Sequence, residues 1–194
     1  MLFRSVSQET THEFKKRFQA YIEGLGKASI AGLIAGALSV DGITSASVVE
    51  YFPPSANVNA RVYIDDGSVD GVSVAKVAEV QSIIDGDGTE SNPGYRAAGV
   101  NVVVAAPGVV TQAVTMSVTA TEGVDLDQLE IDIASALTTY VNTLGVGADI
   151  IYNELIASVM SVYGVADCNI TTPAANVSVS DTQVGRLGTV TITT

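Results

Sequence analysis

The sequence predicts a mixed α+β protein with two small subdomains, each a mostly antiparallel sheet with helices on one face. Amphipathic helical patterns alternate with valine-rich strand patterns along its 194 residues. A chain of this length has room for two domains of about 100 residues. A helix-to-strand corner also occurs twice, as "LIAGALSVDGITSASV" at 33–48 and "LIASVMSVYGVADCNI" at 155–170. The two segments indicate a weak internal α-β-β repeat.

The first subdomain is expected to cover residues 1–107 and to open with an amphipathic helix. "TTHE" at 10–13 has the spacing of a capping box. An apolar stripe then follows at helical period, formed by Phe14, Phe18, Tyr21 and Leu25. Two interpretations of this stripe stay open, because it can fold back on its own subdomain or pack against a neighbouring subunit.

The rest of the first subdomain reads as α-β-β-α-β after "GLG" at 24–26 interrupts the opening helix. Val74, Val77, Val80 and Ile84 give the later helix its apolar side. The expected elements are a helix at about 27–40, a strand at 44–51, a turn at 53–57, a strand at 58–64, a helix over 74–84 and a strand at 99–107.

The second subdomain, residues 108–194, reads as β-α-α-β-β. Its main helix has acidic residues in its first turns, where the helix dipole favours them. The helix also has an apolar stripe formed by Leu126, Leu129, Ile133, Leu137, Tyr140 and Leu144. The expected elements are a strand at 113–121, helices at 124–144 and about 153–162, a strand at 165–170, a loop from 172 and a final strand at 189–193.

A glycine lies at the same place in each repeated corner. Asp41-Gly42 closes one helix and Tyr163-Gly164 closes the other. We expect both Gly42 and Gly164 to adopt positive φ, which bulky residues resist.

Composition narrows the function. The net charge of −12 excludes a general nucleic-acid-binding role, since phosphate contacts need clustered Lys and Arg, and Lys15-Lys16-Arg17 is the only such cluster. Charged residues make up 15% of the chain, against a usual fraction of about 25%, which suggests that other subunits cover part of the surface. The sequence shows no secretory signal and no apolar run long enough to span a bilayer, so no membrane insertion is expected.

A search for catalytic or metal-binding sets favours a non-enzyme without cofactor or metal. His12 is the only histidine and Cys168 the only cysteine, and both fit structural roles better than catalytic ones. "DGDGTE" at 85–90 lacks the glycine and the glutamate that a calcium loop needs at its sixth and twelfth positions. Asp65 and Asp66 precede a glycine and read as a turn.

Four stretches, in order along the chain, resemble the baseplate J-like family of contractile phage tails and related injection machines. They are "FKKRFQAYIEGLGKASIAGLIAGALSVDGITSASVVE", "YRAAGVNVVVAAP", "YVNTLGVGADIIYNELIASVMSVYGVADCNI" and "PAANVSVSDTQVGRLGTVTIT". Members of that family are usually longer, so we expect this chain to be a compact member or a C-terminal portion.

The resemblance implies a structural subunit of the baseplate wedge, assembled in the host cytoplasm and located in the virion tail. Its implied partners are itself, as a homo-oligomer (a dimer within a ring), and other wedge, hub and sheath-initiator subunits. The implied role is to surround the central hub and to relay the trigger for sheath contraction.

Two other functions stay open. One is a small carbohydrate- or receptor-binding α/β module, although tryptophan is absent and the tyrosines are scattered. The other is a hydrolase that uses the aspartates at 65, 66, 85 or 87. For the structural function, we expect the self-contact in the second subdomain, where Thr115 and Thr191 lie on Thr/Val-rich strands that a partner can cover.

Overall fold

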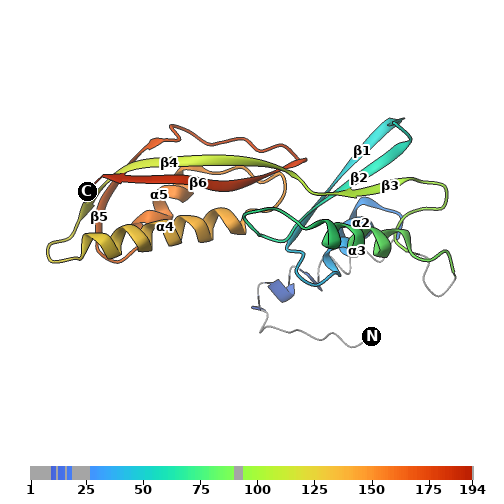
Figure 1. Ribbon diagram of the computed structural model, residues 1–194, viewed down its shortest axis with the longest axis horizontal. Coiled ribbons are helices and arrows are strands. Elements are labelled where there is room, and N and C mark those ends of the chain that lie inside the picture. Colours follow the sequence, from blue (N-terminus) through green and yellow to red (C-terminus); the bar gives the residue numbers. More distant parts are fainter. Residues whose placement is uncertain (1–9, 12, 16, 19–26, 90–93, 194) are drawn as a thin grey trace.

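The computed structural model describes residues 10, 11, 13–15, 17, 18, 27–89 and 94–193. Figure 1 shows two sheets arranged end to end along the longest axis, with helices beneath each of them. No helix within the described ranges is long and apolar enough to cross a membrane.

The first sheet has the order β1-β2-β3 and is built from the first half of the chain. β1 pairs antiparallel with β2, and β3 pairs parallel with β2. Helices α2 and α3 pack on this sheet (Figure 1). The bounds are α2 Ile30–Leu38, β1 Ser45–Ser55, β2 Val58–Asp65, α3 Val74–Asp85 and β3 Val102–Ala105.

The first core forms where the apolar sides of α2 and α3 meet the central strand. Val62 and Ile64 of β2 are fully buried, as are Val80 and Ile84 of α3. These are positions that the sequence pattern predicts as apolar sides. Val74 departs from the predicted stripe, because its side chain is 86% exposed at the helix start.

The second sheet has the order β5-β4-β6 and is built from the second half. β4 pairs antiparallel with β5 and parallel with β6. Helix α4 lies along this sheet and α5 packs against β5 and α4 (Figure 1). The bounds are β4 Gly108–Ala120, α4 Leu126–Thr143, α5 Tyr152–Met160, β5 Val165–Thr172 and β6 Gln183–Thr193.

The second core forms between α4, α5 and one side of this sheet. Ile133 and Leu137 of α4, Leu155 of α5 and Val114 of β4 are fully buried. Asp125 caps α4, since its carboxylate accepts hydrogen bonds from the N–H groups of Asp127 and Gln128. The α4 stripe that the sequence predicts is therefore its core-facing side, except for Leu126, which is 44% exposed at the helix start.

The α+β class is confirmed, but each sheet is mixed rather than mostly antiparallel. In both sheets the central strand has one antiparallel neighbour (β1 or β5) and one parallel neighbour (β3 or β6). Each repeated corner leads a helix into the antiparallel neighbour. The next strand differs, because β2 lies beside β1 whereas β4 separates β6 from β5.

Three expected boundaries are wrong. The strand expected from residue 113 begins at Gly108, as the start of β4. Residues 53–55 continue β1, and the turn is Ala56-Asn57, where both residues have positive φ of 49° and 66°. The final strand begins at Gln183 instead of residue 189. Its first part carries Gly185 and Arg186, which resemble loop residues but are both buried. Gly185 lies against Ile150 and Val179, whereas Arg186 reaches Asp65 of the first half.

Candidate interaction surfaces

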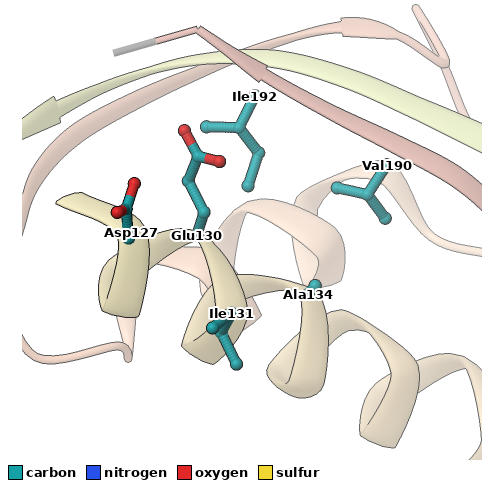
Figure 2. A pocket seen from close by; sticks show the side chains of 6 residues that line it. All are labelled: Asp127, Glu130, Ile131, Ala134, Val190 and Ile192. Carbon is teal, nitrogen blue, oxygen red and sulfur yellow. The ribbon is translucent and has the colours of Figure 1, made fainter.

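A groove lies between α4 and the edge strand β6. We call it the α4–β6 groove, and its volume is about 300 Å³. Figure 2 shows the carboxylate-bearing side chains rising from α4 beside the isoleucine of the strand above. Its lining residues are Asp127, Glu130, Ile131, Ala134, Val190 and Ile192.

The sequence builds this groove from two periodic patterns. On α4, Asp127, Ile131 and Ala134 lie about one turn apart, beside the buried stripe that faces the sheet. On β6, Val190 and Ile192 alternate with exposed threonines and point toward the helix side. Among the described residues, no strand pairs with the outer edge of β6, so one side of the groove is open. The result is a groove of mixed polar and apolar lining, in which two exposed carboxylates lie beside apolar side chains and no cationic side chain from the described ranges takes part.

The opposite side of the same sheet, which we call the outer face, carries the predicted threonines. Thr115 and Thr191 are register neighbours on the parallel strands β4 and β6. On its other side Thr115 pairs with Thr172 of β5. Thr191 is exposed and Thr115 is half-buried. Figure 1 shows α4 and α5 on the other side of this sheet, so neither of these helices covers the outer face.

The N-terminal helical segment, meaning the described residues of 10–18, has a capping box. The N–H of Thr10 donates to Glu13 Oε2 at 2.8 Å, and the N–H of Glu13 donates to Thr10 Oγ1 at 3.3 Å. Phe14 and Phe18 are 51% and 56% exposed, and their rings stack at a centroid distance of 6.1 Å. The other two residues of the predicted stripe, Tyr21 and Leu25, lie outside the described residues.

The two corner glycines have similar backbone conformations but different surroundings. Gly42 has φ +86° and Gly164 has φ +96°. A Cβ added to Gly42 would have no heavy atom within 4 Å, whereas one added to Gly164 would lie 2.9 Å from Val124 Cγ1. The Gly164 corner therefore also packs against the segment that leads into α4.

An ion pair that sequence reasoning missed joins the two halves of the chain. Arg186 Nη2 of β6 pairs with Asp65 Oδ1 at the end of β2, and both side chains are almost completely buried. Arg186 Nε also donates to the carbonyl oxygen of Ser68 at 3.0 Å. We call this region the junction. The available signal was a lone arginine within a run of valine, glycine and leucine at 184–188.

A second contact strengthens the junction. The N–H of Val146 donates to Ser45 Oγ of β1 at 2.8 Å. A Cβ on Gly145 would lie 2.9 Å from the Cβ of Ser45, so the close approach requires glycine there.

Burial raises the pKa of the Asp65 carboxyl above its usual value, although the Arg186 guanidinium and the N–H of Gly67 oppose this shift. Its second oxygen, Oδ2, is buried without a hydrogen-bond partner among the described residues. Arg186 is therefore the main group that favours the ionised form of Asp65, and the role of this carboxylate is structural.

The other acidic residues considered for hydrolysis do not converge with Asp65. Asp66 Oδ1 accepts from the N–H of Ser68 at 3.0 Å, which marks a turn. Asp85 pairs with Arg96, with Oδ1 at 2.7 Å from Nε, and Asp87 bonds to Thr89 in the following turn. Each of these aspartates has a local structural partner.

Cys168 and His12 offer no nucleophile–base pair that can be described. Burial raises the pKa of the half-buried Cys168 thiol, and the neighbouring Asp167 adds to this shift, so less of the reactive thiolate forms. His12 lies outside the described residues. Within the described part of the chain, no three His, Cys, Asp or Glu side chains are placed to hold a metal ion.

Comparison with known families supports the resemblance carried by the sequence. Residues 112–193 match the family model described as the Baseplate J-like protein C-terminal domain. This range contains the α4–β6 groove and nearly all of the second sheet. The resemblance to baseplate J-like proteins is therefore confirmed over the second half of the chain.

A solved structure extends the similarity of fold to the first half. The fold matches a chain from the cryo-EM structure of the anti-feeding prophage (AFP) baseplate, with a TM-score of 0.63 and 13% sequence identity. The match covers 92% of this chain and 42% of that chain, so this chain spans less than half of its length. No curated protein matches. At 13% identity the match to the AFP baseplate chain shows a shared fold, and the family model matches residues 112–193 alone.

Proposed function

We propose that this chain is a structural subunit of the baseplate wedge of a contractile phage tail or a related injection system. The observation that carries the proposal is the family match over residues 112–193. A fold shared with a baseplate chain over 92% of this chain supports it. In this proposal the chain is not an enzyme and takes no cofactor.

The proposed assembly is a ring around the central hub, formed by copies of this chain together with wedge, hub and sheath-initiator subunits. Its place is the tail baseplate of the virion, after assembly in the host cytoplasm. The N-terminal helical segment and the outer face are the proposed contact surfaces, because both leave side chains of an ordered element exposed to a neighbour.

The junction is the proposed route for the contraction trigger. We place the boundary between two subdomains at residues 107 and 108, directly before β4. A buried ion pair and two further hydrogen bonds cross from one half to the other. A displacement imposed on one sheet would therefore be transmitted to the other instead of being absorbed by a flexible linker.

Deletion of the gene in its native particle tests the proposal. We expect tails that lack an organised baseplate and do not contract, and restoration of both by the wild-type gene. Complementation with a gene that carries Glu50→Lys serves as the control for expression and for a change of charge. Glu50 is exposed on β1, which carries none of the proposed contact surfaces. Normal contracting particles without the chain would refute the proposal.

A further inference from the structure

The α4–β6 groove leaves apolar surface exposed on a folded element. Ile131 is 61% exposed and Leu126, at the start of α4, is 44% exposed. The groove continues along β6, where Val190 and Ile192 are only partly covered. Exposed apolar side chains gathered in a concave site mark a docking surface more often than a free surface.

The chemistry of the groove defines its occupant. Asp127 and Glu130 place two negative charges beside the apolar side chains of the groove, and the lining residues that the structure describes include no cation. A complementary segment presents apolar side chains flanked by Lys or Arg. It lies across the open side of the groove and inserts only side chains, because the volume of about 300 Å³ is too small for a helix backbone. In a chain with net charge −12, a segment of this kind stands out.

The N-terminal helical segment has these properties. Phe14 and Phe18 present two exposed aromatic rings on one side of the helix. Lys15 is exposed beside them, and it belongs to the only cluster of basic residues in the sequence, at 15–17. We propose that the N-terminal helical segment of one copy docks in the α4–β6 groove of a second copy. This inference deepens the proposed function by naming the self-contact, and it rests on that function only for its role in the ring.

The two surfaces of one copy lie apart. Figure 1 draws the helical segment beneath the first half of the molecule, whereas α4 begins at the opposite end, beside the C terminus. A head-to-tail contact between copies brings them together, and repetition of such a contact generates a ring when the rotation closes.

A single contact of this kind is weak. A short helix in a groove buries less than the roughly 1,200–2,000 Å² of a stable interface. The purified chain should therefore self-associate reversibly with rising concentration, and the charges should make this association sensitive to salt. Within a ring, other contacts raise the effective concentration of each segment beside its groove.

Sedimentation velocity of the purified full chain tests the charge complementarity. We expect Glu130→Lys and Lys15→Glu each to weaken self-association at least tenfold. The double variant should recover a substantial part of it, since the charges are exchanged. Glu50→Lys makes the same charge change on an exposed residue of β1 and should associate like the wild type. Circular dichroism melting confirms that each variant is folded.

Cysteine cross-linking tests the geometry. In a Cys168→Ser background, Thr11→Cys lies on the helical side that carries Phe14 and Phe18, and Ala134→Cys lies in the groove. Mixing these two single-cysteine variants under oxidation should give a disulfide-linked heterodimer. The heterodimer should not form when Glu130→Lys is added to the Ala134→Cys chain, or Lys15→Glu to the Thr11→Cys chain. The absence of this product at concentrations where the wild type associates would overturn the inference. A chain that carries both cysteines and forms the disulfide only within one monomer would also overturn the inference. Neither result would bear on the proposed baseplate function, which the gene deletion tests independently.

Discussion

Asp65 and Arg186 lie 121 positions apart in sequence and form a pair with almost no exposure to solvent. Removing both charges from water costs several kcal/mol per ion, and their mutual attraction and hydrogen bonds must offset this cost. Arg186 has further hydrogen bonds, since its guanidinium also donates to the carbonyl oxygens of Ser68 and Gly185. Asp65 has fewer, because its Oδ2 has no hydrogen-bond partner among the described residues. The pair therefore serves specificity of the junction more than stability.

Single and double replacements of the pair should differ in how much they destabilise the fold. Arg186→Met leaves a buried carboxylate without its cation and should reduce the free energy of unfolding by about 3–5 kcal/mol. Asp65→Leu combined with Arg186→Met removes both charges and should restore most of that loss. Urea denaturation of both variants measures this. A double variant as unstable as the single one would show that the pair itself stabilises the fold.

The raised pKa of Asp65 predicts a dependence on pH. The folded protein binds the Asp65 proton more tightly than the unfolded chain, in which the pKa of this carboxyl is about 3.8. The contribution of this carboxyl to stability is thus fully present below the unfolded pKa and is lost as the pH rises through the folded pKa. The unfolding free energy of wild type minus that of Asp65→Asn should fall with rising pH above about 4 and then become constant. Urea midpoints across this pH range test it, and a difference that grows with pH would contradict it.

The corner glycines should not be equally sensitive to substitution. Gly42→Ala should cost about 1–2 kcal/mol, since only the positive φ opposes it and the added Cβ meets no atom. Gly164→Ala should cost more, because its Cβ also approaches Val124. Val at either position should destabilise the protein further. Thermal melts rank the variants, and equal melting temperatures for wild type and both variants would argue against the corner interpretation.

At the scale of elements, the outer face is an ordered array of threonines on a sheet that carries helices on its other side only. Thr115→Lys combined with Thr191→Lys places two charges on adjacent strands without entering the core. We expect a folded monomer with a nearly unchanged melting temperature that no longer enters particles. Mass spectrometry of purified tails checks incorporation, with Glu50→Lys as the control, and normal incorporation would place this contact elsewhere.

Local patterns predicted the elements that depend on local interactions. The capping box at Thr10 and Glu13 is confirmed by its reciprocal hydrogen bonds, and the buried stripes of β2 and α4 follow their periodicity. The predicted start of β6 is wrong, because glycines and an arginine suggest a loop unless the buried partner of Arg186 is known. The α4–β6 groove was missed for a related reason. Its acidic and apolar sides come from segments about 60 residues apart, and only the strand order brings them together.

At the scale of the whole molecule, two sheets with the same pattern of neighbours are built in different chain orders. Each has a central strand between one antiparallel and one parallel neighbour. The sequence repeat captures only the corner that enters the antiparallel neighbour, so it could not reveal the parallel pairings. Those pairings require crossovers, and each crossover carries a helix to the inner side of a sheet.

Whether this chain is a baseplate subunit can be tested by a cryo-EM reconstruction of the purified particle that contains it. We expect density for both sheets, with the β5-β4-β6 and β1-β2-β3 orders, in repeated copies around the central hub at the end of the tail. A complete and fully assigned baseplate in which no density fits these two sheets would contradict it.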